Sequence, residues 1–90
     1  MFPDYLDNAK VLEYTAKGHY GFVTDFNEDD LPIEKEICYY AIAQYEKNKD
    51  SFYVFSCDES FEVFGDACLW TLEMCKNCAN LPEDIVWHKK

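Results

Sequence analysis

The sequence predicts an α+β fold, in which a mostly antiparallel β-sheet, arranged as a meander, carries one short C-terminal helix. Two observations predict the sheet: apolar and polar residues alternate along residues 10–16, and residues 51–57 form an apolar run between polar turns. A third observation predicts the helix, because apolar residues after Thr71 recur at helical spacing. With 90 residues, the chain is expected to form a single domain over residues 1–90.

Residues 10–16 (KVLEYTA) are expected to form a half-buried strand, because Glu13 and Thr15 alternate with an apolar face. That face carries Leu12, Tyr14 and Ala16. Residues 17–19 are expected to turn, and residues 20–26 (YGFVTDF) to return beside the first strand as a hairpin. On one side of this second strand lie Tyr20, Phe22 and Phe26.

Residues 27–32 (NEDDLP) are expected to form a surface loop, because three consecutive acids and a proline interrupt the apolar pattern. This loop is the densest negative patch of the sequence. Calcium binding is not expected there, since the longer loop of alternating oxygen ligands around a required glycine is absent.

Residues 33–46 (IEKEICYYAIAQYE) fit two periodicities. A helical stripe is formed by Ile33, Ile37, Tyr40, Ala41 and Tyr45, whereas one face of a strand is formed by Ile37, Tyr39, Ala41 and Ala43. The apolar and aromatic run that begins at Ile37 prefers a pleated surface. We therefore favour a strand over residues 37–46 and keep a helix as the alternative.

The middle of the chain predicts two further strands. Residues 47–50 (KNKD) are expected to turn, residues 51–57 (SFYVFSC) to form a strand, residues 58–60 to turn again, and residues 61–65 (FEVFG) to form a short strand. Both faces of residues 52–57 are apolar, so this strand is expected at the centre of the sheet and covered on both sides.

The helix is expected over about residues 71–80, with Thr71 as its N-cap and Glu73 near the positive end of the helix dipole. Its apolar positions are Leu72, Cys75, Cys78 and Ala79. Asn80 and Pro82 are expected to end it, and residues 85–87 to form a final strand.

Charge limits the function more than any motif does. The chain carries eighteen Asp and Glu residues against eight lysines, with no arginine, and its formal net charge is -10. Such a surface repels phosphate groups and anionic lipid and attracts basic proteins. We therefore expect no nucleic-acid and no membrane partner, and we expect a basic protein partner.

The five cysteines are expected to be structural. An odd number in a chain without a visible signal peptide argues for reduced, buried thiols and a cytoplasmic location. Cys75 and Cys78 form a CxxC pair (CKNC), but a second ligand pair at zinc spacing is absent, so neither a metal nor another cofactor is expected. If any thiol is reactive, we expect it in CKNC, because Lys76 lies between the two cysteines.

An enzyme is not expected, because no group of base, nucleophile and oxyanion donor is visible. The acidic pairs Asp29–Asp30 and Asp58–Glu59 fall on turns, where they are expected to be solvated. Cys57 could form a nucleophilic pair with a histidine, but neither His19 nor His88 belongs to a motif that would hold it there. A small-molecule or metal-dependent enzyme is therefore the weakest alternative.

From residue 37 to 88 the chain runs through a strand rich in tyrosine and alanine, a polar turn, the segment SFYVFSCDESFEVFGD, a capped short helix and a terminal tryptophan strand. In this order it resembles small acidic bacterial immunity proteins of polymorphic-toxin and contact-dependent growth inhibition systems. The resemblance implies a protein that binds one toxin domain tightly and performs no chemistry. Many such toxins are basic nucleases, which would suit a partner of this charge.

The expected binding surface combines carboxylates with aromatic anchors, because hot spots are usually buried aromatics ringed by polar residues. Its carboxylates are Asp25, Glu28, Asp29, Asp30, Asp58, Glu59 and Glu62, and its expected exposed aromatics are Tyr39 and Tyr53. The alternative function is an acidic nucleic-acid mimic or phage-type inhibitor of a DNA-binding enzyme. A mimic needs a long double row of carboxylates, whereas an immunity protein needs a compact patch with an aromatic centre.

Overall fold

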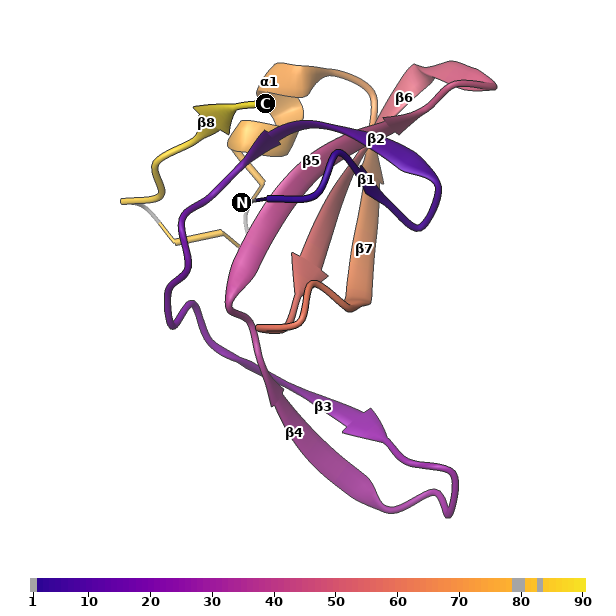
Figure 1. The fold of residues 1–90 in the computed structure, drawn as a ribbon, viewed down its shortest axis with the longest axis vertical. Helices are drawn as coiled ribbons and strands as arrows, with labels where there is room; N and C mark the ends of the chain where they lie inside the picture. The colour runs from indigo at the N-terminus through magenta and orange to yellow at the C-terminus, as the bar shows by residue number, and fades with distance from the viewer. Residues whose placement is uncertain (1, 79–80, 83) are drawn as a thin grey trace.

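The computed structural model describes residues 2–78, 81–82 and 84–90. Its main sheet is antiparallel and has the order β1 (Tyr5–Leu6), β2 (Ala9–Tyr14), β5 (Tyr39–Tyr45), β6 (Asn48–Cys57) and β7 (Val63–Leu69), with β8 (His88–Lys89) also paired to β2. The single described helix, α1 (Leu72–Lys76), packs on β6 and β7. The predicted α+β class is confirmed, and β5, β6 and β7 form the predicted meander (Figure 1).

The predicted hairpin between residues 10–16 and 20–26 is wrong, because β2 pairs with β5 instead. The chain does not turn back at residues 17–19. The N–H groups of Thr15, Gly18 and Tyr20 donate to carbonyls of residues 40, 38 and 37, at 3.0, 2.9 and 2.9 Å. Pairing with the β5 side therefore continues past the end of β2.

This continued pairing carries the chain into a second, two-stranded sheet made of β3 (Phe22–Phe26) and β4 (Pro32–Glu36). The turn between them lies at residues 27–31, inside the predicted surface loop. We call residues 22–36 the arm. Figure 1 shows the arm projecting from one end of the main sheet, with α1 at the opposite end.

The strand alternative for residues 33–46 is correct and the helical one is wrong, since β4 and β5 occupy this segment. Two predicted boundaries move. Residues 48–50 belong to β6 rather than to a turn, because Asn48 pairs with Tyr45 and leaves only residues 46–47 to reverse the chain. The predicted strand over residues 61–65 begins at Val63 and runs to Leu69 as β7.

A β-bulge in β2 changes which side chains are buried. The register shifts between the pairs Val11–Ala43 and Glu13–Ile42. Facing residues of antiparallel strands point to the same side of a sheet, so the bulge sends Val11 and Glu13 to opposite faces although they are two residues apart.

The predicted polar face of β2 is therefore not a solvent face. Glu13 and Thr15 are 4% and 0% exposed. The Glu13 carboxylate pairs with Lys76 Nζ of α1 at 2.8 Å, and Thr15 Oγ1 accepts the backbone N–H of Tyr40 at 3.0 Å. Both buried polar groups thus have the partners that burial demands.

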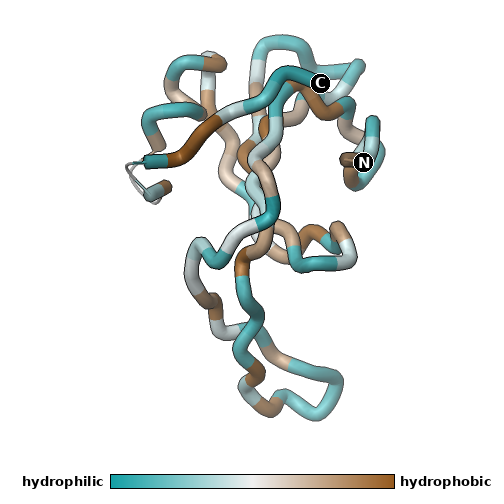
Figure 2. The backbone as a smooth tube through the Cα atoms, turned by 60° about the vertical axis from the view of Figure 1, so that its left-hand side comes forward, coloured by the Kyte–Doolittle hydropathy of each residue, from teal (hydrophilic) through white to brown (hydrophobic). Residues whose placement is uncertain are grey.

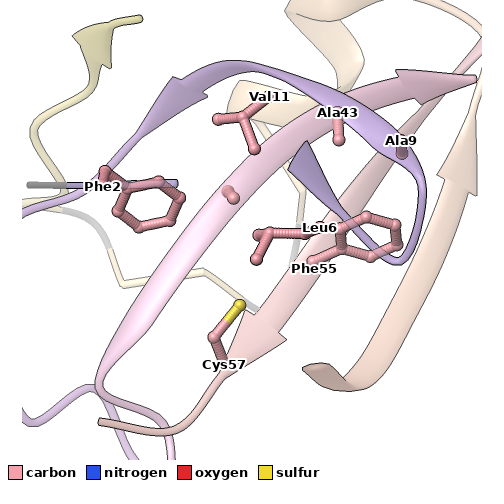
Figure 3. Packing of buried hydrophobic residues seen from close by; sticks show 8 residues of the cluster. Phe2, Leu6, Ala9, Val11, Ala43, Phe55 and Cys57 are labelled. Carbon is pink, nitrogen blue, oxygen red and sulfur yellow. The ribbon is translucent and has the colours of Figure 1, made fainter. Parts of the chain in front are cut away.

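Apolar side chains cover the main sheet on both faces. The first core cluster, shown in Figure 3, contains Phe2, Leu6, Ala9, Val11, Ala41, Ala43, Phe55 and Cys57. The second core cluster contains Ile37, Tyr40, Ile42, Val54 and Cys75. Successive residues of β5 and β6 alternate between the clusters, which confirms that the β6 strand is central and covered on each side.

Helix α1 is shorter than predicted. Thr71 is its N-cap, as expected, and its hydroxyl accepts the N–H of Met74 at 3.0 Å. The helix ends at Lys76 because the Asn77 side chain donates to the Glu73 carbonyl at 3.0 Å, and residues 79–80 of the predicted helix lie outside the described residues. Among the described residues, no helix is long and apolar enough to span a membrane.

The final strand is displaced from its predicted position. Strand β8 comprises His88 and Lys89, not residues 85–87. Ile85 and Trp87 instead pack against the second core cluster, and pairing with β2 begins only after them.

Phe55→Ala should lower the free energy of unfolding by about 3–5 kcal/mol, because Phe55 is 1% exposed and its removal leaves a cavity in the first core cluster. Phe26→Ala is the matched control. Phe26 is 62% exposed, and the same truncation there should change stability by less than about 0.5 kcal/mol. Urea unfolding followed by circular dichroism measures both; equal losses would contradict the division between core and arm.

Candidate functional site

The arm carries more than half of the large hydrophobic side chains that are exposed in the described structure. The described residues include nine large hydrophobic side chains that are exposed, and five of them lie on the arm: Phe22, Val23, Phe26, Leu31 and Ile33. Phe22 is 65% and Phe26 62% exposed. In Figure 2 the arm shows hydrophobic segments interleaved with hydrophilic ones along its length. Exposed apolar groups rimmed by polar ones mark interaction surfaces.

The strand register divides the arm into two faces. Facing residues share a side, so the pairs Phe22–Glu36, Thr24–Glu34 and Phe26–Pro32 form the outer face. The pairs Val23–Lys35 and Asp25–Ile33 form the inner face.

The inner face is turned toward the main sheet at the root of the arm. Lys35 Nζ lies 5.7 Å from the centre of the Phe64 ring of β7 and 3.8 Å from the Asp25 carboxylate. On the outer face at the root, His19 Nδ1 contacts the Glu36 carboxylate at 2.9 Å. The Lys35–Phe64 contact attaches the inner face of the arm to the body, and the outer face beyond Glu36 is left to solvent.

The tip of the arm is an acidic turn organised by Asn27. The Asn27 side-chain oxygen accepts the N–H groups of Asp29 and Leu31 at 2.9 and 3.0 Å, and Asp30 takes a left-handed backbone conformation with φ 58°. Glu28, Asp29 and Asp30 are all exposed there. Residues 22–36 contain six carboxylates and a single basic residue, Lys35, so the arm carries much of the molecule's negative charge.

The predicted carboxylates fall in two places, the arm and one turn of the main sheet. Asp25, Glu28, Asp29 and Asp30 belong to the arm, whereas Asp58, Glu59 and Glu62 lie at the turn between β6 and β7. Figure 1 shows this second turn at the end of the main sheet from which the arm projects.

The carboxylates of the second turn differ in what they do. The Asp58 carboxylate accepts the N–H groups of Ser60 and Glu62 at 2.8 and 3.0 Å and so holds the turn. Glu59 lies 3.7 Å from Lys17 Nζ, in an exposed pair of small energetic weight. Glu62 is exposed.

The two predicted aromatic anchors are less exposed than expected, because Tyr39 and Tyr53 are half-buried against the first core cluster. The Tyr39 ring stacks on Phe61 at 4.7 Å between centroids. Tyr53 packs edge-on to Tyr45 at 5.1 Å, and a hydrogen bond with Cys68 raises the pKa of Tyr53.

The exposed aromatic residues that sequence reasoning did not name as candidate binding residues are Phe22 and Phe26. Their shared side was visible in the sequence, but it was assigned to a hairpin within the sheet. The signal that could have identified them is on the facing strand. There Glu34 and Glu36 lie on the same side of the arm as the two phenylalanines, and acids on that side argue against a core face.

Three cysteines are buried and fit the predicted structural role: Cys38, Cys57 and Cys75. Burial raises the pKa of the Cys57 thiol to about 12 and that of the Cys75 thiol to about 11. Cys68 is exposed, which corrects the prediction of a buried thiol there, because alternate residues of the edge strand β7 face solvent.

The described residues contain no group of three or more His, Cys, Asp or Glu side chains able to hold a metal ion. The possible nucleophilic pair is not assembled either. Cys57 lies in the first core cluster, whereas His19 contacts Glu36 and the His88 ring lies 5.6 Å from that of Tyr14.

A groove of about 370 Å³ runs between the root of the arm and the α1-bearing side of the main sheet. Its apolar lining includes Tyr20, Phe22, Val23, Tyr40, Val54 and Leu81. The groove gives the root of β3 an apolar neighbour that a bound chain could contact.

Comparisons with protein-family models, with curated proteins and with solved structures returned no match to this chain.

Alkylation should begin at Cys68, not in CKNC, when the folded protein is treated with iodoacetamide near neutral pH. Cys57 should react at least about a hundredfold more slowly, because its buried thiol is almost entirely protonated. Peptide mapping by mass spectrometry measures both rates, with the urea-unfolded protein as the control in which the difference disappears. Equal rates in the folded protein would contradict the structural role of Cys57.

Proposed function

We propose that this chain is an immunity-type protein that binds a basic toxin domain, a nuclease in the simplest case, and neutralises it by occlusion. In this proposal the protein is cytoplasmic, needs no cofactor and performs no chemistry. One observation carries the proposal: the outer face of the arm exposes Phe22 and Phe26 among carboxylates, on a part of the fold that projects away from the core.

The arm combines the two components that a tight protein–protein contact needs. Burial of the two phenylalanine rings supplies apolar area, at about 25 cal/mol for each Å² removed from water. The surrounding carboxylates complement a basic surface and speed the encounter. A net charge of -10 extends this attraction over the whole molecule.

The arrangement of the arm favours this proposal over nucleic-acid mimicry. A mimic needs two long uninterrupted rows of carboxylates at the spacing of phosphates. On the outer face, β3 contributes Phe22, Thr24 and Phe26 and no carboxylate, so only β4 supplies acids there. An aromatic centre beside acids instead matches the general composition of protein hot spots.

Charge reversal at the tip, Asp29→Lys with Asp30→Lys, should lower the association rate with the basic partner by about tenfold at low salt, because the two residues are exposed and steer the encounter. The difference should shrink as salt rises. Surface plasmon resonance against the captured partner measures the rates, and Asp29→Asn with Asp30→Asn should give an intermediate loss. An unchanged, salt-independent association rate would refute this electrostatic role.

Truncation of the aromatic centre, Phe22→Ala with Phe26→Ala, should raise the dissociation rate by about a hundredfold and leave the association rate nearly unchanged, because hot-spot contacts form after the encounter. The same instrument separates the two rates. Trp70→Ala is the matched control, since Trp70 is 73% exposed but lies outside the arm. If Trp70→Ala weakened binding and the arm variant did not, the contact would lie elsewhere.

A further inference from the structure

Among the described residues, β3 and β4 pair only with each other, so the backbone of the arm has two free edges. At the root, the Ile37 N–H donates to the Gly21 carbonyl at 2.7 Å, and at the tip the Asn27 N–H donates to the Leu31 carbonyl at 3.0 Å. In an antiparallel ladder, hydrogen-bonded pairs alternate with pairs whose N–H and C=O groups point away from the partner strand.

Counting from either end of the arm gives the same alternation. The backbone groups that point away from the partner strand belong to Phe22, Thr24 and Phe26 on β3 and to Pro32, Glu34 and Glu36 on β4. These are also the residues whose side chains form the outer face.

The two edges are not equivalent. Proline lacks an N–H, so Pro32 interrupts the row of donors on β4, a common way to block strand addition. On β3 the N–H of Phe26 donates to the Asp25 carboxylate at 2.9 Å, which leaves the backbone groups of Phe22 and Thr24. Both of these residues are exposed, and the β3 edge carries neither a proline nor a lysine.

We propose that the free edge of β3, on the side away from β4, binds an extended, basic segment of the partner protein as a third strand. This inference rests on the proposed function and adds its binding mode. The backbone of the segment pairs with Phe22 and Thr24. Its apolar side chains lie beside Phe22 and Phe26 on the outer face, and its lysines or arginines lie beside Asp25 on the inner face and the acidic turn at the tip.

Charge decides which occupant fits this edge. A second copy of the chain would bring the same excess of carboxylates, six against one lysine, and like charges oppose that pairing. A strand that alternates cationic and apolar residues satisfies both faces of the arm at once. The groove at the root, lined in part by Phe22 and Val23, accommodates an apolar side chain at the end of such a strand.

The free edges in the described part of the main sheet fit this occupant less well. On one side β2 is covered by β1 and β8, whose own free edges are only two residues long, and on the other side β7 pairs only with β6. Asp66 is the only acid within Val63–Leu69, so β7 offers a basic strand little charge complementarity.

The probe is the capped heptapeptide Lys-Val-Lys-Val-Lys-Val-Lys, titrated into the ¹⁵N-labelled protein and followed by NMR. Chemical-shift changes should be largest at the amides of Phe22, Val23 and Thr24, with cross-strand nuclear Overhauser effects between the peptide and β3. The same peptide N-methylated at every residue keeps its charge and side chains but cannot donate backbone hydrogen bonds. It should bind about tenfold more weakly or worse, the effect of losing one or two such bonds.

The matched variants are Thr24→Pro and Glu34→Pro, which remove an outward N–H from facing residues on opposite edges. Thr24→Pro should abolish strand pairing, whereas Glu34→Pro should bind like Glu34→Gln, its control for lost charge. If Glu34→Pro alone abolishes pairing, or if the shifts map to β7, the β3 assignment is overturned. Equal binding of the N-methylated peptide would overturn strand addition altogether, and this test holds even if a proline variant fails to fold.

Failure of this inference is distinguishable from failure of the proposed function. Thr24→Pro leaves every carboxylate and both phenylalanines in place. If this variant binds the basic partner normally while charge reversal at Asp29 and Asp30 slows association, the occluding function stands and the strand pairing is refuted. If neither variant changes binding to a basic protein, the arm is not the contact and both are refuted.

Discussion

The pairing of residues 9–20 with residues 37–45 is the interaction on which the rest of the structure depends. It begins as the ladder between β2 and β5 and continues through backbone hydrogen bonds at Thr15, Gly18 and Tyr20. Because these donors are all satisfied by the facing strand, the chain cannot reverse at residues 17–19. The chain reverses instead at the tip turn that begins at Asn27, whose side chain organises that turn. The arm is therefore the far end of one long antiparallel ribbon whose near end is built into the main sheet.

The near end of this ribbon contributes to the stability of the fold, whereas the far end is the part for which we propose binding. The near end of the ribbon is covered on both faces, by the first and second core clusters, and the bulge after Val11 sets which side chains of β2 face each cluster. Glu13 can be buried there only because Lys76 of α1 lies 2.8 Å away, which ties the helix to a strand distant in sequence. In the described structure no second layer covers the outer face of the far end. Its apolar groups are exposed and contribute little to folding, which is the basis for proposing a contact there.

Local patterns in the sequence were sufficient for the fold class and for most strands. The two-sided apolar run at residues 52–57 correctly predicted a central strand, and Thr71 correctly predicted a helix start. Strand partners could not be predicted, because residues 10–16 are as compatible with pairing to residues 20–26 as to residues 37–45. That single error placed Phe22 and Phe26 on a hairpin within the sheet, whereas both are exposed on the arm. The carboxylates were easier to place, since charge alone puts such residues at turns and surfaces.

The same carboxylates would oppose self-association through the two exposed phenylalanine rings. An apolar patch on a free strand edge normally invites pairing between copies, and proteins oppose it with charge or proline along the edge. Here Pro32 protects β4, while β3 relies on the field of the surrounding acids. A negative field repels only partners of like sign, so an edge that it closes to a second copy stays open to a basic chain. In the proposed function, protection from self-association and selectivity for a cationic partner would therefore both follow from one charge distribution.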